Sequence, residues 1–126
     1  VHSKYKASVM ASMRVNKKTV SRWGIYKLKK KLNKTDYLIN GVVEKPAIKD
    51  APSNKAVIGR YILSKSIFAK LRTIKPSQGG EIHITDAIQS SISNNEKFIA
   101  HNFQGKYLDC GTMNGYINSC KEIAKL

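Results

Sequence analysis

Short apolar segments, each ending at residues that favour turns, run along this chain of 126 residues. Residues 7–15, 23–28 and 38–43 show the loose alternation of apolar and polar residues that is typical of strands. Residues 56–63, AVIGRYIL, are the strongest strand candidate, and Gly59 within them predicts a close approach of another group to the backbone. A chain of this length favours one domain or part of one.

Apolar residues at helical spacing predict three helices. The first begins near Ser64 or Ser66 as its cap. Its expected core-facing residues are Ile67, Phe68 and Leu71. The second follows a turn-rich loop at residues 75–80, is capped by Thr85 or Asp86, and buries Ala87, Ile88 and Ile92. The third covers residues 114–126, and its apolar face comprises Ile117, Cys120, Ile123 and Ala124.

Turn residues complete the expected layout. Asn40-Gly41 predicts a turn or bulge inside the third strand, and Pro46 ends that strand because proline cannot donate to a sheet. Residues 97–103 and 106–110 flank Gln104-Gly105, which predicts a hairpin. The pattern therefore favours a mixed α/β fold. No GxGxxG or Walker loop is present, so the chain has no phosphate-cradling turn of its own.

The charge is strongly positive, because 23 lysine and arginine residues face 8 acidic residues and leave a net +15. Two explanations stay open. A basic surface for nucleic acid or another anion is one, and the dense lysines of residues 27–34 support it. Codon bias is the other and the favoured one, because lysine predominates over arginine, the usual phosphate ligand, and isoleucine and asparagine are also abundant.

The rest of the sequence argues against membrane-spanning, secreted and disulfide-rich proteins. No apolar run approaches the roughly 20 residues that span a bilayer, and the first residues do not resemble a secretory leader, so we expect a cytoplasmic protein without a membrane partner. Cys110 and Cys120 are too few for a disulfide framework, and we expect reduced, partly buried thiols. His2, His83 and His101 are scattered, and no acidic partner is expected for any of them.

Two positions could carry chemistry. Glu44 can accept hydrogen bonds from sugar hydroxyls, and the adjacent Lys45 can pair with a phosphate, although chemistry alone favours a solvated surface pair. Asp109 precedes the last helix and could hold Mg²⁺, or it could act as a helix cap, a role that Thr112 would serve equally well.

Six motifs in order resemble a known family, the C-terminal part of bacterial UTP–glucose-1-phosphate uridylyltransferases. The resemblance covers about residues 7–126. The motifs are SRWGI at 21–25, GVVEKP at 41–46, APSN at 51–54, AVIGRYIL at 56–63, GGEI at 79–82 with TDAI at 85–88, and YLDCG at 107–111.

The resemblance implies a fold, a reaction and a set of roles. The fold is α/β, a partial Rossmann-like nucleotidyltransferase fold with a mixed sheet and flanking helices, in which residues 1–126 form the C-terminal, sugar-binding part of the domain. The reaction joins UTP and α-D-glucose 1-phosphate to give UDP-glucose and pyrophosphate, with Mg²⁺. By resemblance, the backbone of Gly24 approaches the glucose, Glu44 binds its hydroxyls, Lys45 contacts the phosphate as substrate-binding and catalytic residue, and Asp109 lies on the metal side.

The departures from the family pattern lead to further expectations. The N-terminal half is absent, and with it the triphosphate loop, the uracil-reading residues and the principal metal-binding aspartate, so base specificity stays open and we expect the fragment to be inactive alone. Within the matched part, unusual residues are Lys55 for Leu, His83 for Gln, Leu108 for an aromatic residue and Met113 for Lys.

The missing half also affects the expected partners. Losing the N-terminal strands should expose an apolar face and a bare sheet edge, so a homo-oligomer or a complementing N-terminal half is expected. The alternative function is a non-catalytic basic module for nucleic acid or another anionic partner, which we favour less.

Overall fold

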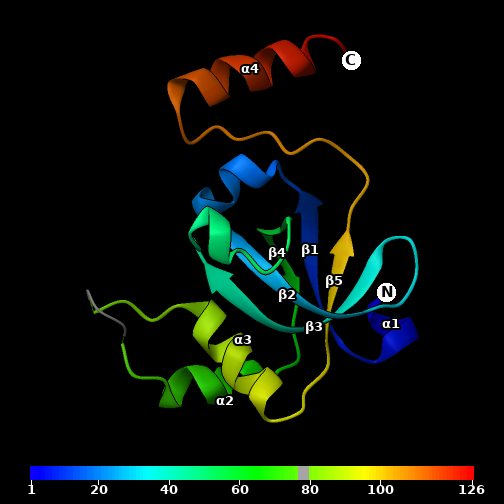
Figure 1. The fold of residues 1–126 in the computed structure, drawn as a ribbon, viewed down its shortest axis with the longest axis vertical. Helices are drawn as coiled ribbons and strands as arrows, with labels where there is room; N and C mark the ends of the chain where they lie inside the picture. Colours follow the sequence, from blue (N-terminus) through cyan, green and yellow to red (C-terminus); the bar gives the residue numbers. More distant parts are fainter. Residues whose placement is uncertain (77–79) are drawn as a thin grey trace.

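Five strands curve into a closed sheet within residues 1–76 and 80–126, the residues that the computed structural model describes (Figure 1). The strands are β1 (Ser8–Arg14), β2 (Gly24–Lys31), β3 (Asp36–Glu44), β4 (Lys55–Ile62) and β5 (Phe98–Asn102). Their order is β1, β4, β2, β3, β5 and back to β1. Only β1 and β5 pair in parallel, so the mixed sheet expected from the sequence is confirmed.

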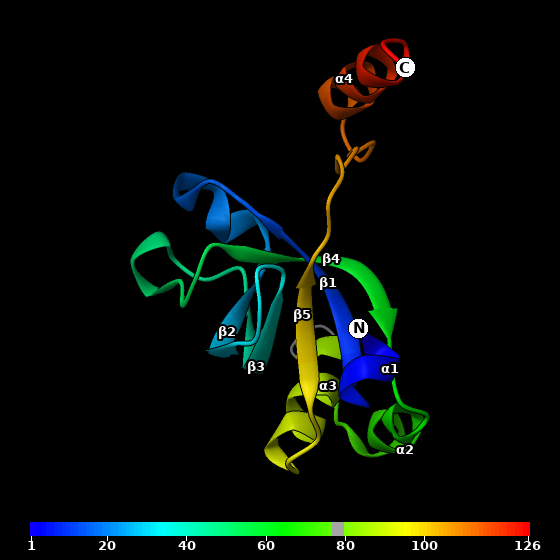
Figure 2. The ribbon, with the colours of Figure 1, turned by 90° about the vertical axis from the view of Figure 1, so that its right-hand side faces the viewer.

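Short helices flank this sheet. They are α1 (His2–Tyr5), α2 (Ser66–Thr73), α3 (Ile84–Ser93) and α4 (Met113–Ile123), with the 3-10 turns η1 (Lys17–Arg22) and η2 (Ile48–Asp50). Helices α2 and α3 lie together against one side of the sheet, whereas α4 stands clear of it at the other end of the molecule (Figures 1 and 2).

The largest core lies between the sheet and the α2–α3 pair. Met10, Tyr26 and Phe98 from three strands meet Ile67 of α2 and Ile88 of α3 there. All five side chains are at most 5% exposed, and burying such side chains is worth about 1.5–3 kcal/mol each. A second cluster of Val20, Ile25 and Ala56, with Trp23 packed against it, supports the other end of β2. This second cluster holds the strand end that enters the candidate site.

The expected bare sheet edge is absent among the described residues. Each strand has a neighbour on both sides, because β2 also meets β4 at the pair Ile25 and Ala56. The expected hairpin at residues 97–110 is wrong for the same reason. Strand β5 already pairs with β1 on one side and β3 on the other, so residues 106–110 find no free edge and remain irregular. The bulge expected at Asn40-Gly41 is present, since Ile39 and Gly41 pair with consecutive residues of β2.

Several expectations about helix caps and faces are also wrong. The residue before α2 is Lys65, which makes no side-chain cap, but the expected Ser64 lies next to it and its hydroxyl accepts from the N–H of Ser66 at 3.4 Å. The N-cap residue of α3 is His83, which makes no side-chain cap, while Thr85 and Asp86 lie inside the first turn of α3. Burial of Ile67 and Ile88 therefore fixes these helices more than capping does. Phe68, expected in the core, is 65% exposed, because α2 turns only one narrow face to the sheet. Residues 77–79 of the expected loop lie outside the described residues.

Helix α4 forms as expected, but its apolar face is not buried. Ile117 is 43% exposed and Ile123 is 56% exposed, and both cysteines are exposed rather than partly buried. The helix packs against the segment at 106–112 instead of the sheet, and an ion pair between Lys106 and Glu122 joins the two. The one buried residue in α4 is therefore the small, polar Ser119.

Candidate functional site

A groove of about 480 Å³ opens where the ends of β2 and β3 meet the middle of β4 and the irregular segment before α4. Three of the four site residues that the sequence singled out, Gly24, Glu44 and Asp109, line this groove. The full lining comprises Arg22, Trp23, Gly24, Glu44, Val57, Ile58, Gly59, Arg60, Tyr61, Thr85, Tyr107, Leu108, Asp109 and Cys110. Residues separated by 85 positions in the sequence are thus brought to one concave surface.

Gly24 and Glu44 form one unit at the groove, because they are paired residues on β2 and β3. A β-carbon added to Gly24 would lie 3.0 Å from Oε2 of Glu44 and 3.4 Å from methyl groups of Val42 and Val57. The missing side chain therefore leaves room for the carboxylate to lie across the strand. This arrangement offers a ligand a carboxylate acceptor at the groove, directly beside the buried backbone of Gly24.

Lys45 lies beside the groove but is not one of its lining residues. It follows the end of β3 in the left-handed conformation, with φ at 44°, and its backbone N–H donates to the Trp23 carbonyl at 3.0 Å. This turn interrupts the strand's alternation of sides, as the following Pro46 predicts. The side chain is exposed, and its contact with a phosphate stays a prediction.

Tyr61 is a groove residue that sequence reasoning did not single out, although it lies in the AVIGRYIL motif. Burial and the negative charge of Glu44 both raise the pKa of its phenol. The phenol therefore stays protonated at neutral pH and can donate a hydrogen bond to a ligand oxygen.

An aromatic contact holds the irregular segment before α4, which forms one side of the groove. The rings of Trp23 and Tyr107 meet edge to face, with centroids 5.6 Å apart and an angle of 78° between planes. Such pairs contribute about 0.5–1.5 kcal/mol beyond simple burial. The contact fixes residues 107–110 against the start of β2, and it thereby carries Asp109 to the groove.

The residues around Asp109 do not complete a magnesium site by themselves. Among residues 1–76 and 80–126, no group of three or more His, Cys, Asp or Glu side chains is placed to hold a metal. One Asp109 oxygen, Oδ1, already accepts from the N–H of Gly111 at 3.0 Å. The single Asp109 carboxylate does not form a metal site by itself, and its place at a metal stays a prediction.

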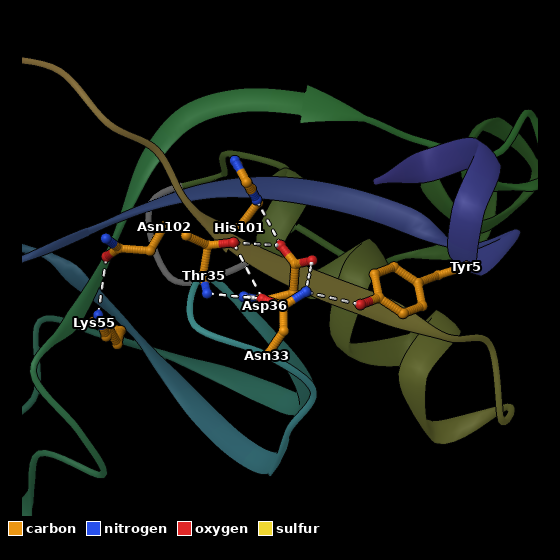
Figure 3. A network of polar contacts seen from close by, with 7 residues as sticks. All are labelled: Tyr5, Asn33, Thr35, Asp36, Lys55, His101 and Asn102. Carbon is orange, nitrogen blue, oxygen red and sulfur yellow. Dashed lines mark hydrogen bonds and ion pairs between the residues drawn. The ribbon is translucent and has the colours of Figure 1, made fainter.

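A second polar cluster lies at the other end of β3, where Asp36 pairs with His101 of β5 (Figure 3). It corrects the expectation that the histidines lack acidic partners. Nδ1 of His101 lies 2.6 Å from Oδ1 of Asp36, and Asn33 donates to the other carboxylate oxygen at 2.6 Å. The same Asn33 amide also donates to the hydroxyl of Tyr5. Asp36 is 3% exposed, so this network satisfies a buried charge at the junction of β3 and β5.

Lys55, which departs from the family pattern, is also buried. It is 5% exposed, and its ammonium donates to Oδ1 of Asn102 at 2.9 Å (Figure 3). The ammonium nitrogen also lies 5.2 Å from the centre of the Tyr37 ring. Burial and the nearby charges of Arg14 and Lys31 lower its pKa. Lys55 does not line the groove, so this departure leaves the candidate site untouched.

Comparison with known proteins decides the family. The model of the nucleotidyl transferase family matches residues 1–125. The chain belongs to this family. A UTP–glucose-1-phosphate uridylyltransferase of Pseudomonas aeruginosa is 38% identical over 97% of the chain, which covers 44% of that relative. A putative enzyme of the same name from Methanocaldococcus jannaschii is also 38% identical, with 97% of the chain and 42% of the relative covered.

Solved structures of family members agree. The crystal structure of an apo UDP-glucose pyrophosphorylase matches with a TM-score of 0.91 and 41% identity, over 98% of this chain and 45% of the other. A UDP-glucose pyrophosphorylase complexed with UDP-glucose matches with a TM-score of 0.88 and 41% identity, over 98% and 46%. The chain therefore spans less than half the length of the relatives that it matches. No helix in the described residues has the length and apolarity needed to cross a membrane.

Proposed function

We propose that the chain is the C-terminal, sugar-binding part of a UTP–glucose-1-phosphate uridylyltransferase. The observation that carries this proposal is the convergence of Gly24, Glu44 and Asp109 on one groove, from three separate motifs of the chain. The likeness to a family member solved with UDP-glucose supports the same ligand. The cytoplasmic location expected from the sequence belongs to this proposal.

In the proposed reaction, a phosphate oxygen of glucose 1-phosphate attacks the α-phosphorus of UTP, and pyrophosphate leaves. No nucleophilic side chain is needed, so the protein contributes by positioning and by charge neutralisation. Here Glu44 accepts hydrogen bonds from glucose hydroxyls, the protonated Tyr61 donates to a ligand oxygen, and Lys45 at the rim neutralises phosphate charge. The part of the active site that binds UTP would come from outside this chain.

Magnesium is proposed only as a partner of the complete active site. Asp109 is the residue that would face the ion, and the described residues supply no set of ligands around it. We therefore assign Asp109 the role of holding the segment at 107–111 in place through its bond to Gly111, and we derive no step that passes through the ion.

Calorimetric titration of the purified chain with UDP-glucose tests the proposal. We expect saturable binding that weakens by about tenfold or more in Glu44→Gln, because hydrogen bonds to a charged group are worth about 1.5–3 kcal/mol. Asp50→Asn is the matched control, since Asp50 is an exposed carboxylate outside the groove. Unchanged affinity in Glu44→Gln, from a folded protein, would remove Glu44 from the site.

The role of Lys45 is tested by the rate of UDP-glucose formation. This rate is measured after the chain is mixed with the N-terminal part of the P. aeruginosa relative. Lys45→Ala should lower the rate of UDP-glucose formation far more than Lys29→Ala, which removes an exposed lysine of β2. Equal rates in the two variants would contradict the role of Lys45.

The alternative function has a test of its own. Salt-dependent binding of nonspecific DNA, without binding of UDP-glucose, would favour the basic module instead.

A further inference from the structure

Strand β4 is bulged where it passes the groove. Met10 pairs with Tyr61 and Ser12 pairs with Val57, so residues 58–60 of β4 face the single residue Ala11 of β1. Gly59 has φ at +60°, and a β-carbon there would meet no atom of the described residues within 4 Å. No part of the described chain therefore makes the close approach expected at Gly59, and the glycine permits a left-handed backbone. Bulges of this kind re-aim a side chain.

The residue that follows this turn is Arg60. It lines the groove that holds Glu44 and Asp109, and it also lines an adjoining hollow of about 360 Å³ beside Phe103, Tyr107 and Leu108. The side chain is exposed, and its Nη1 donates to the carbonyl of Gly59 at a long 3.3 Å. None of the ion pairs within residues 1–76 and 80–126 includes Arg60. Its guanidinium charge is therefore available to a ligand.

Two cations line the groove, Arg22 and Arg60, whereas Lys45 does not. Arg22 is the last residue of a 3-10 turn, whereas Arg60 is the last residue of the bulge within β4 and directly precedes Tyr61, which pairs with Met10. This pairing anchors the backbone next to Arg60 before any ligand binds, which favours precise recognition. A planar guanidinium matches two phosphate oxygens at once, unlike the ammonium group of a lysine.

We propose that Arg60, aimed by the β4 bulge, binds the phosphate next to the sugar in the groove. This inference rests on the proposed function, because it assumes a sugar phosphate or sugar nucleotide as the ligand. In this arrangement the two residues recognise different parts of the ligand. Glu44 recognises the neutral hydroxyls of the sugar, while Arg60 compensates the negative charge of the phosphate, which would otherwise be repelled by Glu44 and Asp109.

Calorimetric titration with UDP-glucose at low and high NaCl tests the role of Arg60. Arg60→Gln should weaken binding by about tenfold to hundredfold, and it should make the affinity less dependent on salt. Arg60→Lys keeps the charge without the planar fork, so it should restore part of the affinity. Arg72→Gln is the matched control, because Arg72 is an exposed arginine of α2 outside the groove. Thermal unfolding of each variant checks that the fold is intact.

The outcomes separate this inference from the proposed function. If the unmodified chain binds UDP-glucose and Arg60→Gln binds it with the same affinity and salt dependence, the role of Arg60 is overturned and the proposed function stands. If Arg60→Lys binds no better than Arg60→Gln, the positive charge at this position makes no contribution, and the role of Arg60 in compensating the phosphate charge is overturned. If the folded, unmodified chain binds no UDP-glucose, the proposed function fails and the role of Arg60 fails with it.

Discussion

The Asp36 carboxylate shows how one buried residue ties pH to stability. Burial raises its pKa, but hydrogen bonds from His101 and Asn33, the charge of His101 and a bond with Tyr5 together lower the pKa below the ordinary value of 3.8. A carboxyl whose pKa is lowered by folding stabilises the fold above its unfolded value, and that stabilisation is lost as the pH falls through the folded value. The network therefore stabilises the fold most at neutral pH, and this stabilisation is lost in acid.

Replacing Asp36 with asparagine tests this coupling. We expect Asp36→Asn to lower the free energy of unfolding at about pH 6 by about 1–3 kcal/mol, since a buried hydrogen-bonded charge is lost. The difference between the variant and the unmodified chain should shrink as the pH falls below about 4. Urea unfolding at several pH values measures both effects, with the exposed Asp50→Asn as control. A difference that stays constant from about pH 6 to about pH 2 would contradict the coupling.

Sequence reasoning finds residues in motifs and misses residues that meet only in space. Gly24, Glu44 and Asp109 were predicted because each lies in a motif of the family, and the structure brings them to one groove. Asp36 and His101 are 65 positions apart, and no spacing rule joins them. They become neighbours only because β3 pairs with β5, which depends on how the whole sheet closes.

At the scale of elements, the five strands and the three longer helices were predictable from the sequence. The strands' pairing partners and the burial of each helix face were not. Alternation and helical spacing depend on neighbouring residues, so the sequence carries them directly. The hairpin partner at residues 106–110 fails because β5 has no free edge, a fact about topology. For helix α4, the spacing of apolar residues correctly predicts a helix. The same spacing does not show that the apolar face of this helix stays exposed.

Among the described residues, no strand or other helix makes extensive contact with α4, so local interactions should decide its stability. Thr112 is its N-cap, and the threonine hydroxyl accepts from the N–H of Gly115 at 3.0 Å. Thr112→Ala should destabilise α4 by about 1 kcal/mol. Amide exchange within Met113–Ile123 should become roughly fivefold faster, while exchange in the sheet stays unchanged. Thr73→Ala, at the C-terminal end of α2, is the control, and equal exchange in both variants would contradict the capping role.

At the scale of the whole molecule, closure of the sheet and exposure of α4 have different consequences. The sheet leaves no unpaired strand among the described residues, so association by adding strands is not expected. The apolar stripe of α4, which we define as Met113, Tyr116, Ile117 and Ile123, is between 43% and 74% exposed. A stripe of this kind marks an interaction surface. The relatives that the chain matches are more than twice as long as the chain.

The isolated chain should therefore associate with itself through this stripe until another part of the domain covers it. We expect sedimentation velocity to show dimers or larger species at tens of micromolar, and Ile117→Asp to shift them to monomer. Burying an isoleucine is worth about 1.5–3 kcal/mol, and a charge in its place would be desolvated. Asn118→Asp adds the same charge next to the stripe, outside it, and should associate like the unmodified chain. If Ile117→Asp associates as strongly as Asn118→Asp, the stripe of α4 is not the contact. If the unmodified chain is a monomer, the exposed stripe does not drive self-association.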